Sequence, residues 1–113
     1  MTKLTREAIL AAPLSTKEID VPQWGGTVTI SEMAVGKRNA MLKSIMGPDG
    51  KVNVDPGIEL KLFIAGMYDP AFTSDDAKAL QVVSGAAVSY VAKEIMVFNG
   101  MAPDASDEAR GES

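Results

Sequence analysis

The spacing of hydrophobic and polar positions changes along the chain, from strict alternation near the N-terminus to a helical period further on. Over residues 17–21, Ile19 and Val21 alternate with acidic residues, and TVTI at 27–30 repeats the alternation. Such a period of two is typical of a strand with one buried face. Between the two runs lies PQWGG, whose glycines can adopt a positive φ. The pattern predicts a β-hairpin at about residues 17–31 with a loop of about five residues.

Two helices are predicted around this hairpin. Residues 4–11 read as a short helix with Thr5 as its cap and a stop near Pro13. A longer run begins at Ser31 and ends at Gly47, where GPDG predicts a turn. We expect its apolar side to include Ala34, Met41 and Ile45, and its basic side to include Lys37, Arg38 and Lys43.

A third helix has the sharpest start signal in the chain. Asp55 is a good N-cap and Pro56 suits the first helical position. The run GIELKLFIAGMY over residues 57–68 is apolar almost all round, and only Glu59 and Lys61 are charged. A helix of this kind is either the central helix of a fold or part of an interface.

The last helix is predicted over residues 77–98, where apolar positions recur every three or four residues. Before it, Thr73 and Asp76 have the spacing of a capping box. Gly85 is expected to kink or split the run, and the Asn-Gly pair at 99–100 is a C-terminal stop signal.

The length of 113 residues suits one domain. We therefore predict a mainly α fold with a small N-terminal β-hairpin (α+β), as a single domain of three to four helices over residues 1–100. Residues 101–113 are predicted to be a disordered acidic tail, because the segment from 103 onward carries four acids against one arginine.

The composition argues against an enzyme and against several kinds of ligand. The chain has neither cysteine nor histidine, so disulfides, thiolate ligands and the usual general base are excluded. Carboxylates such as Glu59 and Asp69 show no spacing that favours a catalytic pair. The net charge of −4 disfavours nucleic-acid binding. No apolar run reaches the roughly 18 residues of a membrane span. We expect no catalytic residue, cofactor, metal, nucleic acid or membrane partner, and a cytoplasmic location.

Two local motifs have simpler interpretations than ligand binding. DGKVNVD at 49–55 has the oxygen spacing of a calcium loop, but Val54 and Leu60 occupy the positions that need glycine and glutamate. A turn followed by a helix cap explains it better. WGG lacks the residues that complete a phosphate-binding loop.

Trp24, the only tryptophan, allows two interpretations. It either packs over the junction of hairpin and helix or stands exposed as a binding hot spot. The methionines are likewise core filler or part of an adaptable surface. The predicted protein-interaction residues are Trp24, Ile58, Leu62, Phe63, Met67, Tyr68 and Phe72.

The order of these segments resembles the tail assembly chaperones of long-tailed, non-contractile bacteriophages and related prophages. In that family a V-P-x-W-G-G-x-V-x-[VI] hairpin precedes a helix, followed by a helix ending near Asp-Pro, a short cap and a last helix ending in Asn-Gly. The matching positions are Val21, Pro22, Trp24, Gly25, Gly26, Val28, Ile30, residues 68–76 and residues 99–100. The resemblance covers about residues 14–100.

The resemblance implies a non-enzymatic chaperone that acts in the cytoplasm of the infected bacterial host and is absent from the mature virion. It would bind the tape-measure protein and the tail-tube protein and self-associate. In this family a ribosomal frameshift often produces a longer form. Two alternatives stay open: a structural head–tail connector or tail-terminator protein retained in the virion, and a small-molecule enzyme that uses carboxylates.

Overall fold

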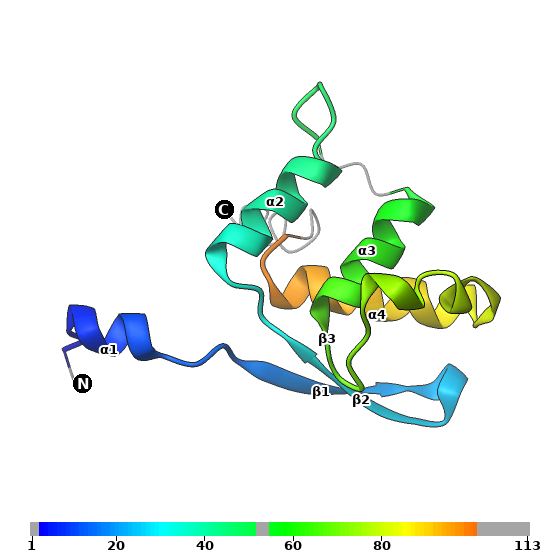
Figure 1. Cartoon of the computed structure of the whole chain (residues 1–113), viewed down its shortest axis with the longest axis horizontal. Coiled ribbons are helices and arrows are strands. Elements are labelled where there is room, and N and C mark those ends of the chain that lie inside the picture. Colours follow the sequence, from blue (N-terminus) through cyan, green and yellow to red (C-terminus); the bar gives the residue numbers. More distant parts are fainter. Residues whose placement is uncertain (1–2, 52–54, 102–113) are drawn as a thin grey trace, which may run out of the picture.

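The computed structural model describes residues 3–51 and 55–101. Over these ranges the chain forms a mixed α+β fold with four α-helices and a three-stranded antiparallel sheet (Figure 1). The elements are α1 (Arg6–Ala11), β1 (Thr16–Val21), η1 (Pro22–Trp24), β2 (Gly26–Ser31), α2 (Val35–Ile45), α3 (Pro56–Gly66), β3 (Met67–Asp69), η2 (Ser74–Asp76), η3 (Ala79–Val82) and α4 (Gly85–Phe98), where η denotes a short 3-10 helix.

The two strands predicted from the alternation pair with each other, but they belong to a three-stranded sheet and not to a separate small hairpin. β1 and β2 pair from Thr16 opposite Ser31 to Val21 opposite Gly26, so the connecting loop has four residues rather than five. Gly25 closes the loop with a φ of 68°, a value that disfavours any side chain. The predicted inward residues, Ile19, Val21, Val28 and Ile30, are all buried.

The helix predicted over residues 57–68 ends two residues early, and this part of the prediction is wrong. α3 stops at Gly66, and Met67–Asp69 instead forms β3 on the edge of β2, with Met67 opposite Ile30. Met67 is buried and Tyr68 is exposed, as the alternation of a strand requires. The free edge of β2 therefore decides the conformation of an apolar segment that reads as helix on its own.

The second helix begins later than predicted. Ser31 is the last residue of β2, and α2 begins at Val35 after Ala34, whose side chain makes no cap. Of the expected apolar side, Ile45 is buried and Met41 is half-buried, but Ala34 is exposed. Of the expected basic side, Arg38 is half-buried. The turn after α2 is confirmed, since Gly50 donates to the carbonyl of Gly47 and has a φ of 78°.

The run predicted as one last helix is split at Gly85, as the glycine suggested. The capping box forms, with the Thr73 N–H donating to the Asp76 carboxylate at 2.8 Å, but it caps the short η2. α4 has its own cap, the Ser84 hydroxyl, which accepts from the Ala87 N–H at 3.1 Å. Extended backbone at Val83 separates η3 from this cap.

The core lies between the sheet, α3 and α4. Its largest fully buried side chains are Phe63, Ile30, Ile45, Leu62, Ile95, Val21 and Val91. Gly66 allows α3 to approach α4, because a Cβ at this position would lie only 2.7 Å from Cδ1 of Ile95. Met101 is also buried and belongs to the core rather than to the predicted tail. Residues 102–113, the rest of that tail, lie outside the described residues.

Candidate functional site

The predicted interaction residues are divided between the core and the surface. Leu62 and Phe63 are fully buried and Met67 is 6% exposed, so none of them is available to a partner in this fold. Ile58 and Phe72 are half-buried and pack against the core. Only Trp24 and Tyr68 are largely accessible, at 40% and 60%.

Trp24 packs on the core, as the first of its two interpretations predicts, and is also partly exposed. Its ring meets the ring of Phe63 edge-on, with centroids 6.0 Å apart and planes at 78°. Phe63 in turn contacts Phe72, at 5.3 Å between centroids. Such edge-to-face pairs stabilise beyond the area that they bury. Trp24 therefore anchors the hairpin loop on α3 while two-fifths of its surface stays in water.

Tyr68 lies elsewhere on the molecule. It sits on β3 between the buried Met67 and the exposed Asp69, so its side chain points to the face of the sheet away from the core. Trp24 packs on the core side of the sheet, against α3. The predicted interaction residues thus do not form one continuous surface.

Asn99 is a structural residue that the sequence analysis treated only as a helix stop. It is buried at 8% exposure, and its side-chain oxygen accepts from the Met33 N–H at 2.6 Å. Its amide nitrogen donates to the carbonyl of Ile95 at 2.9 Å and, at a longer 3.4 Å, to that of Ser31. One amide side chain therefore joins the end of α4 to the segment between β2 and α2.

Arg38 reinforces the same junction from α2. Its Nε donates to the Asn99 carbonyl at 2.7 Å, and Nη2 reaches the Gly100 carbonyl at 3.3 Å. These carbonyls lie at the C-terminal end of α4. A positive charge is stabilising there, because the C-terminal end of the helix dipole is partly negative. Gly100, with a φ of 68°, completes the C-cap that the Asn-Gly pair predicted. The cap was visible in the sequence, but its partners more than 60 residues away were not.

A groove of about 250 Å³ opens between the start of α3, η3 and the start of α4. It is lined by Pro56, Glu59, Leu60, Leu80, Gln81, Val83, Gly85, Val88 and Ser89. Glu59 is its one carboxylate and accepts a hydrogen bond from the Ser89 hydroxyl at 2.8 Å. The volume lies below the roughly 300–1,000 Å³ of small-molecule sites, and the lining offers no second acid to Glu59. Most of the residues that line the groove are apolar, and Glu59 is the one charged residue among them.

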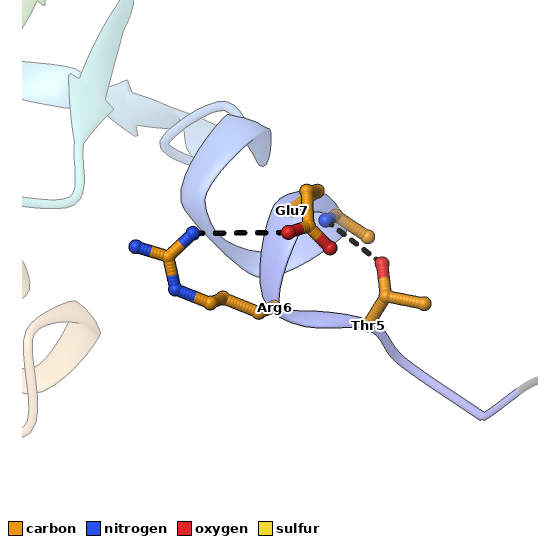
Figure 2. Close-up of polar contacts among 4 residues, drawn as sticks. Thr5, Arg6 and Glu7 are labelled. Atoms are coloured by element: carbon orange, nitrogen blue, oxygen red, sulfur yellow. Dashed lines mark hydrogen bonds and ion pairs between the residues drawn. The ribbon is translucent and has the colours of Figure 1, made fainter.

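The N-terminal helix α1 stands away from the body of the molecule (Figure 1). Its polar groups find partners within the helix itself: the Thr5 hydroxyl accepts from the Ala8 N–H at 3.1 Å, and Arg6 lies 3.7 Å from Glu7 (Figure 2). The Thr5 cap predicted from the sequence is thus confirmed. No residue of α1 is buried. We call residues 3–14 the arm.

The arm exposes apolar side chains that the fold does not cover. Leu4, Ile9, Leu10 and Leu14 are each at least 51% exposed, and Leu10 reaches 69%. Single exposed apolar residues are ordinary on protein surfaces, and the grouping of four on one projecting segment makes the arm a candidate interaction site.

Within the described residues, no three acidic side chains gather where they could hold a metal ion, and no helix has the length and apolar character to cross a membrane. Residues 52–54 of the segment compared with a calcium loop lie outside the described part. Comparison with protein-family models, with curated proteins and with solved structures finds no match. Proposals about function therefore rest on this chain's own residues and geometry.

Proposed function

We propose that the protein is a non-enzymatic tail assembly chaperone of long-tailed, non-contractile bacteriophages or prophages. It binds the tape-measure protein, promotes assembly of the tail-tube protein around it, and self-associates. It acts in the cytoplasm of the infected bacterium and leaves before the virion is complete.

The observation that carries the proposal is apolar surface exposed on an otherwise well-packed fold. The arm and the aromatic residues Trp24 and Tyr68 offer this surface, while the core is closed by fully buried side chains. Burial of such surface against another chain is a main source of binding free energy between proteins. The groove beside Glu59, by contrast, lacks the pair of converging groups that an acid–base reaction needs.

The hairpin motif that carries the family resemblance also has a structural explanation here. Val21 and Ile30 are fully buried, and Gly25 has a positive φ. Trp24 packs on Phe63. These residue types are required by the fold of the hairpin, so the motif supports a shared fold, and the partner surface must be sought in the exposed residues.

A pull-down with the tape-measure protein tests the proposal. We expect the chain, co-expressed with a tape-measure protein of such a phage, to keep that protein soluble and to co-purify with it. Tyr68→Asp is expected to weaken co-purification, because it places a charge on the exposed aromatic position. Val35→Asp, at a 75% exposed position on α2, is the matched control. Absence of any complex with the wild-type chain at about 100 µM, a concentration that detects even weak binding, would reject the proposal.

Mass spectrometry of purified virions separates the chaperone from the alternative. A head–tail connector or tail-terminator protein is retained in the particle in fixed copy number. An assembly chaperone is present in infected-cell lysates and missing from the particle. If the chain is found in virions at a stoichiometric level, the chaperone proposal is rejected in favour of the structural protein.

A further inference from the structure

We propose that the arm of one copy binds in the groove between α3, η3 and α4 of a second copy. This inference rests on the self-association included in the proposed function, but not on the tape-measure protein. It specifies both halves of the contact: Leu4, Ile9, Leu10 and Leu14 on the arm, and the apolar walls of the groove around Val83 and Leu60.

The arm does not lie on the groove of its own chain. Ser15 is held to the sheet by two hydrogen bonds with Glu32: its N–H donates to the carboxylate at 2.7 Å, and its carbonyl accepts from the Glu32 N–H at 2.9 Å. Between Ser15 and the end of α1 lie three residues, a span of at most about 14 Å. The molecule is 48 Å long, and Figure 1 places α1 at one end of that axis and the η3 segment at the other. In this structure the arm and the groove of one chain therefore lie at opposite ends, and each is accessible to a second copy.

The two surfaces match in chemistry. The groove is walled by Leu60, Leu80, Val83 and Val88, and Glu59 is the one charged residue in its lining. The arm carries Lys3 and Arg6 against Glu7, two basic residues against one acidic, and thus a net charge of +1. Apolar side chains with a surplus positive charge complement an apolar groove with one carboxylate.

The area involved sets the strength of the contact. The four exposed fractions of the arm residues, 68%, 57%, 69% and 51%, correspond to about 250 Å² if a whole Leu or Ile side chain presents on the order of 100 Å². The groove adds less than this, because two of its walls, Leu80 and Val88, are themselves buried. Two contacts per pair therefore stay below about 1,000 Å², the size of a weak interface. Association is expected to be weak and to depend on protein concentration.

The free edge of β1 offers a second route to self-association, and its charges oppose it. Glu18 and Asp20 lie on the outward face of this strand, and both are exposed. In a two-fold antiparallel pairing of β1 with itself, these acids face themselves or each other, which is destabilising. Charged residues on an edge strand are a common protection against such pairing.

Sedimentation equilibrium on the purified chain alone provides the first test. We expect the wild type to associate over about 1–500 µM and Leu10→Asp to weaken association at least tenfold. Because α1 makes no buried contact, this variant is expected to keep the wild-type circular dichroism and melting temperature. Val35→Asp controls for added charge and should associate like the wild type. A wild type that stays monomeric at 500 µM, or a Leu10→Asp variant that associates normally, overturns the proposal.

Disulfide trapping tests the groove itself, and it is clean because the chain has no cysteine. A chain with Leu10→Cys is mixed with one carrying Val83→Cys, and the pair is oxidised. Val97→Cys, at 42% exposure against 37% for Val83, is the matched control on the far end of α4. We expect the Leu10–Val83 cross-link to form at least five times faster than the Leu10–Val97 one. Equal rates, or a dominant Leu10–Leu10 product, overturn the assignment of the groove. Neither result depends on tape-measure binding, so the two proposals fail separately.

Discussion

Replacing Asn99 with alanine removes a side chain that joins the end of α4 to the segment between β2 and α2. In the wild type its oxygen accepts from the Met33 N–H at 2.6 Å, in a buried position. Its nitrogen donates to the Ile95 carbonyl at 2.9 Å. Alanine provides neither group, whereas the Arg38 bond to the carbonyl of residue 99 involves the main chain and remains possible.

The loss of stability depends on whether the group that bonded to the Asn99 side chain still has another hydrogen-bond partner. The Met33 N–H is left buried without an acceptor, which costs about 1–3 kcal/mol. The Ile95 carbonyl keeps the Asn99 backbone N–H at 3.0 Å, so the second bond contributes only about 1 kcal/mol. Together these give about 2–4 kcal/mol, a large part of the 5–15 kcal/mol that stabilises an ordinary domain. The melting temperature is expected to fall by on the order of 10 °C.

Urea unfolding measures this difference directly. Fluorescence of Trp24, the only tryptophan, and circular dichroism should report the same transition, so that the linear extrapolation applies. Asn39→Ala, at an exposed position on α2, is the control and is expected to stay within about 0.5 kcal/mol of the wild type. An Asn99→Ala protein as stable as that control would refute the role assigned to the buried amide.

Two further predictions concern packing. Gly66→Ala is expected to lower the free energy of unfolding by about 1–3 kcal/mol, because the new methyl group would meet Ile95. Ile95→Ala should relieve part of that loss in a double-mutant cycle. Strictly additive free energies of urea unfolding would contradict the close approach of α3 to α4. Phe63→Ala should cost about 3–5 kcal/mol and Trp24→Ala only about 1–2 kcal/mol, since Phe63 is fully buried and Trp24 is 40% exposed. Thermal unfolding followed by circular dichroism ranks the two, and equal losses would be inconsistent with this packing.

Several elements could be predicted because their signals lie within a few residues of one another. Thr5 and Asp55 cap the helices that follow them, with the Asp55 carboxylate accepting from the Ile58 N–H at 2.8 Å. The alternation around Ile19 and Val28 fixes which face of the hairpin is buried. Gly100 ends the last helix in a left-handed conformation. All of these features arise from local hydrogen bonds or from the period of the side chains. Local hydrogen bonds and side-chain period do not depend on the rest of the chain.

The candidate site was less accessible to sequence reasoning. The apolar helix predicted over residues 57–68 forms over Pro56–Gly66, but the sequence does not tell which of its side chains face the core when almost every position is apolar. Leu62 and Phe63 are consequently internal, although they were expected at an interface. The arm was predicted as a helix, but its lack of contact with the body is visible only in three dimensions.

On its own, the sequence determined the buried face of the hairpin, the caps at Thr5 and Asp55 and the stop of the last helix at Asn99 and Gly100. Only the tertiary structure decided that Met67–Asp69 forms a strand and that α2 begins at Val35. It also decided that Asn99 forms a hydrogen bond with Met33, 66 positions away in the chain. The physical reason is the range of the interactions. Caps and periods act over three or four residues, whereas a free strand edge or a buried N–H selects its partner only after distant segments have been brought together.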